Sequence, residues 1–258
     1  MNLGIAGRKA IVCASSRGLG KACARALAEA GCKVVINGRD AKKLEAAASE
    51  LSVAGVKVIP VVADVATAEG QKRLLAACPQ PDILVNNNAG PPMRDFRELT
   101  RQQMLDGVVA NMVVAIELIQ KVIDPMCERK FGRIVNITSG SVKMPLAGLD
   151  LSSGARAGLT AFLAGVARKV AEKNVTINNI LPGAFDTDRL RSTLSKTAEQ
   201  TGKSEAEVAT ARMAGIPAKR FGNADEFGAA CAFLCSAQAG YITGQNLLID
   251  GGAFNGAF

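Results

Sequence analysis

Short apolar runs alternate with segments in which apolar residues recur every three or four positions, and this alternation continues along the whole chain. The runs predict β-strands over residues 10–14, 34–36, 56–62, 82–87, 132–139, 175–181 and 246–249. The segments between them predict amphipathic helices, of which the longest cover about 101–130 and 152–173, with turns at Gly31 and Gly55. The pattern therefore predicts an α/β fold: one doubly wound domain over residues 1–258, with a seven-stranded parallel sheet and helices on both faces.

One segment departs from this rhythm. Residues 187–216 are polar and rich in Ala, Thr and Lys. They predict helices inserted over the carboxyl edge of the sheet, and such a segment is a candidate substrate lid.

The first predicted strand leads through a loop of small residues directly into a helix. The loop consists of Ala14, Ser15, Ser16, Arg17, Gly18, Leu19 and Gly20. Small residues let the backbone approach a ligand, and the free N–H groups and dipole of a helix N-terminus favour an anion. Glycine and serine also mark ordinary turns, so the loop alone leaves that alternative open. The anion that a strand, loop and helix of this kind predict is a dinucleotide pyrophosphate.

Polar residues end the other predicted strands as well. Carboxyl ends of parallel strands meet at one edge of a sheet, and ligands of doubly wound sheets bind beyond that edge. The residues placed there are Ser15–Gly20, Arg39, Asp64, Asn87, Ser139 and Pro182-Gly183. Their convergence is stronger evidence than any single motif, and it predicts a Rossmann-like nucleotide site.

Three residues near the second strand end favour a phosphorylated dinucleotide. An acidic residue there would bind the adenosine ribose and repel a 2'-phosphate, but this chain has Asn37 and Arg39, with Arg17 in the preceding loop. Two guanidinium groups can pair with a 2'-phosphate, so NADP(H) is the expected cofactor. Asp40 fits the N-cap of the next helix.

Composition excludes several kinds of site. The chain has no histidine, which removes Ser-His-Asp and Cys-His catalysis and His-ligated metals, and no metal is expected. Seven cysteines without C-x-x-C spacing predict buried free thiols. The formal charge of +8 is spread along the chain and aromatic residues make up 4%, which predicts a solvated surface and no nucleic-acid partner. No apolar run spans a membrane and the N-terminus lacks a signal-peptide core, so a cytoplasmic protein with a small-molecule substrate is expected.

Together these residues resemble the short-chain dehydrogenase/reductase family, and the likeness runs from about Leu3 to Gly252. The family usually has glycine where this chain has Ala14. Asp64-Val65 resembles its adenine-contacting pair, and Pro182-Gly183 with Thr187 resembles the segment that holds the nicotinamide carboxamide. The C-terminal signature is matched by residues 241–244 and 250–252.

The family's Asn-Asn-Ala-Gly motif can be placed in two ways. It matches Asn87–Gly90 literally; counted from the preceding strand it falls on Asn86–Ala89, with Asn88 in place of alanine. The second placement gives the usual interval to Asn111 and is preferred. Asn87 and Asn88 are then implied to lie at the cofactor.

The resemblance also implies where this chain departs from its relatives. The family uses a Ser, a Tyr, a Lys and an Asn for catalysis, and Asn111 and Ser139 match two of them. The usual intervals place Ser152 at the Tyr position and Arg156 at the Lys position. The only tyrosine, Tyr241, falls in the C-terminal signature, away from the nicotinamide. A serine hydroxyl is a much weaker acid than a phenol and Arg is a poor proton shuttle, so cofactor placement is expected to persist while the rate falls by about 10² to 10⁴.

Several groups are candidates for the missing proton donor. Ser139 and Ser152 could polarise a substrate oxygen while a water chain past Asn111 delivers the proton. Lys143 and Asp150 could also reach the cleft; for both, the alternative is a solvated loop charge.

The function implied by the resemblance is that of an NADP(H)-dependent oxidoreductase, similar to 3-oxoacyl carrier protein reductases, which moves a hydride between nicotinamide and a carbonyl or alcohol. The catalytic residues would be Asn111, Ser139, Ser152 and Arg156. The alternative is a protein of this fold that binds NADP(H) for a lyase or hydratase step or for regulation. The resemblance also implies a homotetramer, built through the helices predicted at 101–130 and 152–173 and the last strand.

Overall fold

The computed structural model of the protein describes residues 2–52 and 56–257, so the turn predicted at Gly55 lies outside the described residues. The strands are β1 (Lys9–Val12), β2 (Lys33–Gly38), β3 (Val58–Val62), β4 (Ile83–Asn86), β5 (Gly132–Ile137), β6 (Val175–Pro182) and β7 (Asn246–Ile249). The α-helices are α1 (Gly18–Glu29), α2 (Ala41–Leu51), α3 (Ala68–Ala77), α4 (Arg101–Val108), α5 (Val114–Glu128), α6 (Asp150–Val170), α7 (Asp188–Thr201), α8 (Glu205–Ala214) and α9 (Ala224–Leu234).

The seven strands form one sheet in the order β3-β2-β1-β4-β5-β6-β7, and every neighbouring pair is parallel. The chain builds outward from β1 in one direction, returns to β4, and then builds outward in the other. This reversal between β1 and β4 is the place where a doubly wound sheet opens a crevice at its carboxyl edge. The predicted fold class is confirmed.

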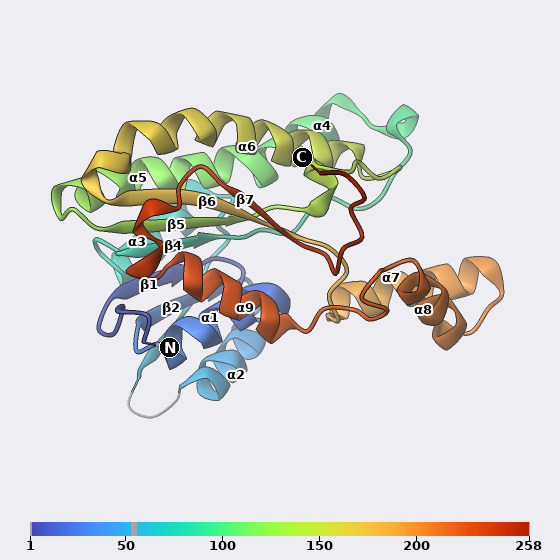
Figure 1. The fold of residues 1–258 in the computed structure, drawn as a ribbon, viewed down its shortest axis with the longest axis horizontal. Helices are drawn as coiled ribbons and strands as arrows, with labels where there is room; N and C mark the ends of the chain where they lie inside the picture. Colours follow the sequence, from blue (N-terminus) through green and yellow to red (C-terminus); the bar gives the residue numbers. More distant parts are fainter. Residues whose placement is uncertain (1, 53–55, 258) are drawn as a thin grey trace.

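Helices cover both faces of the sheet, as Figure 1 shows. Alternate strand residues face opposite sides, so that Val12 and Ile36 pack with α1, α2 and α9, while Ile11 and Leu84 pack with α3, α5 and α6. Burial on both faces explains why the strands read as continuous apolar runs rather than as alternating ones.

Several element boundaries differ from the sequence prediction: β2 covers Lys33–Gly38, β3 begins at Val58 and β5 ends at Ile137, and two further differences have a local cause. β1 ends at Val12, not residue 14, because Ala14 has a φ of 44°, outside the extended region. The helix predicted over 101–130 is divided into α4, a π-helical turn at Val109–Val113 and α5. In that turn the carbonyl of Ala110 accepts a hydrogen bond from Asn88, a residue of the neighbouring loop. Hydrophobic periodicity along one helix cannot predict a hydrogen bond to a residue of another segment.

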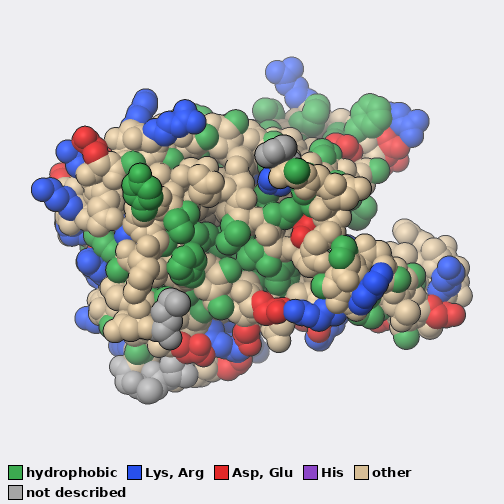
Figure 2. All heavy atoms as spheres, viewed as in Figure 1, with side chains coloured by type: hydrophobic (Ala, Val, Ile, Leu, Met, Phe, Trp, Pro, Cys, Tyr) green, Lys and Arg blue, Asp and Glu red, His purple; other side chains and the backbone are tan. Residues whose placement is uncertain are grey.

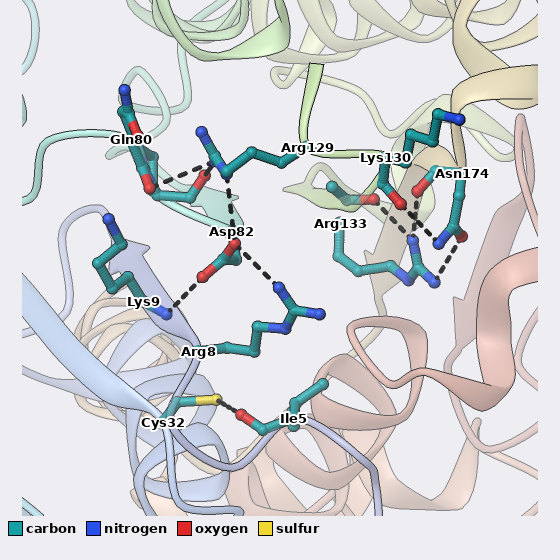
Figure 3. Close-up of polar contacts among 12 residues, drawn as sticks. Ile5, Arg8, Lys9, Cys32, Gln80, Asp82, Arg129, Lys130, Arg133 and Asn174 are labelled. Atoms are coloured by element: carbon teal, nitrogen blue, oxygen red, sulfur yellow. Dashed lines mark hydrogen bonds and ion pairs between the residues drawn. The ribbon is translucent and has the colours of Figure 1, made fainter. Parts of the chain in front are cut away.

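The amino edge of the sheet holds buried charged side chains that pair with backbone groups and, in the case of Asp82, also with arginines (Figure 3). The carboxylate of Asp82 accepts hydrogen bonds from the backbone N–H of Lys9 at 3.0 Å and from Arg8 at 3.3 Å, and Nε of Arg129 lies 3.7 Å away. Arg133 is only 1% exposed and donates to carbonyls of Ser236 at 2.9 Å and Asn174 at 2.8 Å. These contacts of Asp82 and Arg133 stabilise the amino end of the sheet, while Nε of Arg129 has no hydrogen-bond partner among the described residues.

The carboxyl edge is open by comparison. α7 and α8 form a hairpin that projects beyond this edge (Figure 1), and the outline of the molecule is indented between the hairpin and the region under α4 (Figure 2). α7 and α8 fall within the segment 187–216, with Thr187 as the N-cap of α7, and the role of this segment as a substrate lid stays a prediction.

The thiol prediction is confirmed for six of the seven cysteines, which are buried; Cys127 is half-buried, and all seven are free. Burial raises the pKa of the Cys13 thiol to about 12, so this thiol stays protonated at neutral pH. Within the described part of the chain, every helix is too short or too polar to cross a bilayer.

Candidate active site

The loop after β1 has the backbone shape that a phosphate cradle requires. Ala14 at φ 44° and Gly18 at φ 57° both adopt left-handed conformations, which turn the chain sharply into α1. A Cβ on Gly20 would lie 2.5 Å from the carbonyl oxygen of Ala14 and 2.8 Å from Nδ2 of Asn87. Only glycine fits there, and the first turn of α1 carries no acidic residue that would repel an anion.

Two residues predicted to contact the cofactor serve the backbone instead. Ser15 is fully buried; its hydroxyl donates to the carbonyl of Val12 at 2.6 Å and accepts from the N–H of Asn37 at 3.0 Å. The amide of Asn37 accepts from the N–H of Ala14 at 3.2 Å and donates to the carbonyl of Ala63 at 2.9 Å. Asn37 thus holds the loop in shape. Its amide is already bonded to the backbone of two neighbouring loops, so the ribose contact predicted for its side chain finds no support in this geometry.

The cations predicted to select a 2'-phosphate stand at the surface. Arg17 is exposed at the N-cap of α1, and Arg39, also exposed, lies 3.7 Å from the carboxylate of Asp64. Asp40 caps α2 by accepting from the N–H of Lys43, as predicted. The side chain of Val65 is buried against the core, and its carbonyl accepts a buried hydrogen bond from Nε2 of Gln71 at 3.1 Å.

The three asparagines after β4 have separate tasks. Asn87 donates to the carbonyl of Ala14 at 3.1 Å and so joins the β4 loop to the glycine-rich loop. Asn88 donates to the carbonyl of Ala110 at 3.2 Å, at the π-helical turn. Asn86 starts a ladder of amide hydrogen bonds that crosses β5, β6 and β7 through Asn136, Asn179 and Asn246, with bonds of 2.9, 3.0 and 2.8 Å. This ladder, which sequence reasoning missed, joins β4, β5, β6 and β7 side by side, starting from Asn86 at the end of β4.

Asn111 lies in the π-helical turn beside a small cavity. Its amide donates to the carbonyl of Gly107 at 3.2 Å, while its Oδ1 is buried with no hydrogen-bond partner among the described residues, as is Oδ1 of Asn86. Both residues line a cavity in which about 20 Å³ is open to the centre of a water molecule, and Arg156 lines it as well. The cavity therefore has room for one water and two acceptors to bind it.

Ser139 ends β5 and begins a 3₁₀ turn at Gly140–Val142. Its hydroxyl oxygen accepts from the N–H of Ser141 at 3.1 Å and from the hydroxyl of Ser141 at 2.9 Å. Both bonds leave its own proton free to be donated to a ligand. Ser141 is buried and was not identified from the sequence, because a second serine in a strand-end loop carries no signal of its own.

Ser152 and Arg156 lie one turn apart on α6 and are bonded to each other. Nε of Arg156 donates to the hydroxyl oxygen of Ser152 at 3.3 Å, and its Nη1 donates to the carbonyl of Ile137 at 2.7 Å. Arg156 is only 7% exposed. Burial and, to a smaller degree, the positive charge of Arg189 lower the pKa of Arg156 to about 10, so it remains a cation at neutral pH.

Three of the remaining predicted residues are Gly183, Thr187 and Lys143. A Cβ on Gly183 would lie 2.6 Å from Cβ of Asp250, and a Cβ on Gly18 would lie 3.8 Å from Thr187, so Thr187 lies beside the glycine-rich loop. Lys143 packs over the ring of Phe254 at 5.5 Å.

Two titratable residues lie apart from the centre. Asp150 is exposed at the start of α6 and accepts from the N–H of Gly148 at 3.2 Å. Tyr241 is fully exposed and precedes β7, at the amino edge of the sheet and so away from the strand tips that carry Ser139.

Comparison with known proteins agrees with this architecture. The family model described as enoyl-(acyl carrier protein) reductase matches residues 13–253. The chain belongs to the short-chain dehydrogenase/reductase family. It is 30% identical to the NADPH-dependent reductase BacG of Bacillus subtilis over 95% of this chain and 97% of that protein, and 31% identical to the 3-oxoacyl-[acyl-carrier-protein] reductase FabG of Escherichia coli over 96% and 98%. Among solved structures, L-sorbose reductase from Gluconobacter frateurii, in complex with NADPH and L-sorbose, matches with a TM-score of 0.93 and 28% identity over 99% of this chain and 100% of that one.

One further residue of this short-chain dehydrogenase/reductase site was not identified from the sequence. Arg189 is the second residue of α7. A Cβ added to Gly90 would lie 3.2 Å from both Nη1 and Nη2 of Arg189 and 3.5 Å from Ser152 Oγ, so the guanidinium and the serine hydroxyl both lie beside Gly90. Because Arg189 is an exposed arginine in a polar helix, its position over the site depends on how the α7–α8 hairpin folds back, which no local pattern reveals.

Proposed function

We propose that the protein is an NADPH-dependent reductase of a carbonyl compound. One observation carries the proposal: an anion cradle at the start of α1 and a hydroxyl–guanidinium pair on α6 open onto the same edge of the sheet as Ser139. The relatives named above, described as NADPH-dependent or as crystallised with NADPH, support the choice of cofactor.

The residues present fit NADP(H). Gly18 adopts a left-handed backbone conformation, and Gly20 has no room for a side chain. The loop can therefore leave the first N–H groups of α1 open to a pyrophosphate. Arg17 and Arg39 supply positive charge where a 2'-phosphate of the adenosine would lie. Thr187 lies beside this loop, and Thr187 with the backbone of Pro182-Gly183 would hold the nicotinamide end.

The chain's own groups then act on the substrate oxygen. When bound, NADPH supplies a hydride to the carbonyl carbon, and one proton from water completes the hydroxyl, which gives the alcohol and NADP⁺. Ser139 donates its free proton as a hydrogen bond to the carbonyl oxygen and so stabilises the negative charge that develops there. Asn111, with its unpaired Oδ1, would bind the water in the adjoining cavity. Arg156 holds a positive charge next to this water.

The resemblance places Ser152 and Arg156 where the family has its proton-donating Tyr and its Lys. In this proposal Ser152 takes part as a weaker hydrogen-bond donor, and Arg156 keeps the cation without exchanging protons readily. The lack of a phenol near Ser139 therefore predicts slow chemistry with intact cofactor binding, lower by about 10² to 10⁴ than with a phenolic acid.

The test is to mix the purified protein with NADPH and a panel of ketones, oxo acids and 3-oxoacyl thioesters while following NADPH absorbance. Turnover is expected, with a loss of about 10²- to 10³-fold in Ser139→Ala while NADPH still binds. Ser153→Ala is the matched control, because its hydroxyl donates to the carbonyl of Leu149 within the same helix. Failure of the protein to bind NADPH in calorimetry would refute the proposal.

A second function is favoured by the distance of Tyr241 from the site. Without a phenolic donor, the same pocket suits a protein that binds NADP(H) for a non-redox lyase or hydratase step, or for regulation. Tight NADPH binding without oxidation of NADPH by any carbonyl in the panel would support this second function.

We also propose that the protein assembles as a homotetramer. α4 and the turn after it expose Met104, Leu105, Val108 and Val109, and Phe162 is exposed on α6. β7 pairs with β6 on one side only, and its Leu247 is exposed. Apolar helix faces and an open edge strand are surfaces that self-association covers. Light scattering after size-exclusion chromatography should give a mass four times that of the chain; a monomer of 26.7 kDa would contradict this.

A further inference from the structure

We propose that Arg189 binds an anionic group of the substrate, and that the substrate is a small 2-oxo or 3-oxo carboxylic acid. The inference rests on the proposed reductase function and adds the substrate class. It starts from an imbalance of charge: two arginines lie close together at the site, and neither pairs with a side-chain carboxylate of residues 2–52 and 56–257.

Arg156 is the buried member of the pair. Its contacts are the hydroxyl of Ser152 and the carbonyls of Ile137 and Asn88, all of them neutral. Within the described residues no acidic group is near enough to affect its charge. Arg133, the buried arginine at the amino edge, has its guanidinium nitrogens bonded to four oxygens and serves only the fold. Arg156 makes fewer bonds, which leaves N–H groups and net positive charge beside the catalytic hydroxyls.

Arg189 reaches the site from α7, whereas Arg156 lies on α6. The guanidinium of Arg189 reaches to the loop after β4, where its two terminal nitrogens lie beside Gly90. In the described part of the chain Arg189 takes part in no ion pair, although its neighbour Arg191 is paired with Asp186 at 2.9 Å. A guanidinium with two free nitrogens side by side matches the two oxygens of a carboxylate.

Ser152 contacts Arg156 and lies close to Arg189, and this spacing limits the size of the ligand. Its oxygen accepts from Arg156, so its proton is free for an acceptor on the side of Arg189. Ser152 Oγ and the nitrogens of Arg189 lie within 3.5 Å of one point. A ligand that bridges them carries its carbonyl oxygen and its anionic group no more than one or two carbons apart, which describes a 2-oxo or 3-oxo acid. A 3-oxoacyl thioester has no charge at that position.

Because no phenol is present to donate a proton, the reaction would gain from a substrate that Arg189 holds in place. An anion held by Arg189 positions the carbonyl at Ser139 through binding energy rather than through acid strength. The products of the reduction would be a hydroxy acid and NADP⁺.

The experiment compares matched substrates in the full-length protein. Acetoacetate is compared with methyl acetoacetate, which differs only by esterification of the carboxylate, and pyruvate with methyl pyruvate. Binding of each is followed by ligand-detected NMR without nucleotide, and turnover by NADPH oxidation. We expect the acids to bind and react more strongly than their esters, by about 10- to 100-fold, because each bidentate charged contact is of that size.

The variants are Arg189→Gln and Lys196→Gln. Arg189→Gln should lower the acid-to-ester ratio of kcat/KM by about 10-fold or more. Lys196 is exposed on the same helix and its replacement changes the charge equally, so Lys196→Gln should leave the ratio unchanged. Arg189→Lys should restore part of it.

Two results would overturn the inference while leaving the reductase proposal intact: esters or thioesters reduced as well as the acids, or a loss of NADPH affinity in Arg189→Gln that matches the loss for acetoacetate. If no carbonyl were reduced at all, the reductase proposal would fail, and the NMR titration would still decide whether Arg189 binds the acid.

Discussion

Arg156 donates its Nε–H to the hydroxyl oxygen of Ser152, 3.3 Å away across one turn of α6. This bond makes the Ser152 oxygen an acceptor and directs the serine proton away from the helix. The pair therefore presents a hydroxyl donor with a buried cation behind it. Such a pair can stabilise negative charge on a ligand, although neither group is an effective proton donor at neutral pH.

The first prediction concerns the charge at position 156. Burial lowers the pKa of Arg156 to about 10, so the cation is fully present from pH 6 to 9 and should add no pH dependence to kcat/KM there. In Arg156→Lys the same burial acts on a side chain with an ordinary pKa of ~10.4, so its positive charge should be lost progressively toward pH 9. The variant's kcat/KM should fall with rising pH relative to wild type.

Arg168→Lys is the control for this pH profile, because Arg168 lies exposed near the end of the same helix. Parallel profiles for wild type and Arg156→Lys would show that position 156 carries no functional charge.

The second prediction is a gain of function. Ser152→Tyr combined with Arg156→Lys should raise reductase activity, by up to about 10²-fold, because a phenol beside a cation exchanges protons far more readily than serine. The measurement is single-turnover NADPH oxidation. The same two changes placed in a Ser139→Ala background should give little gain. A folded double variant that binds NADPH and reacts no faster than wild type would show that proton donation does not limit the rate.

The third prediction tests the glycine-rich loop. A methyl group at Gly20 would collide with the Ala14 carbonyl, so Gly20→Ala should weaken NADPH binding more than 10-fold and destabilise the protein by about 1–3 kcal/mol. Gly154 on α6 has open space around its Cβ position, so Gly154→Ala should stabilise the protein by about 0.5–1 kcal/mol. Calorimetry and urea unfolding measure both effects. Equal behaviour of the two variants would contradict the role given to Gly20.

The fourth prediction concerns Ala14, where the resemblance leads one to expect glycine. Its φ of 44° costs a non-glycine residue about 1–2 kcal/mol, more than the ~0.5–1 kcal/mol that glycine loses in chain entropy. Ala14→Gly should therefore raise the free energy of unfolding by about 0.5–1 kcal/mol. Ala206→Gly, on the exposed surface of α8, should lower it by about 1 kcal/mol. A less stable Ala14→Gly variant would mean that the loop is unstrained.

Much of the candidate site could be predicted because its residues follow strands. Once β4 and β5 are placed, Asn87 and Ser139 must lie at the same edge, since parallel strands end together. Asn37 lies near the end of β2 and Val65 follows β3, yet the side chain of Asn37 bonds to the backbone and that of Val65 is buried in the core. Position along the chain places a residue at the edge; which way its side chain turns depends on neighbours from other strands.

The sequence by itself determined the order of strands and helices, the loop of small residues before α1 and the edge of the sheet at which polar residues gather, because hydrophobic periodicity and small residues act over a few positions. Only the tertiary structure decided the π-helical turn that holds Asn111, the amide ladder from Asn86 and the approach of Arg189 to Ser152. Each of these depends on contacts between segments far apart in the chain, whose energies exist only after the sheet has formed.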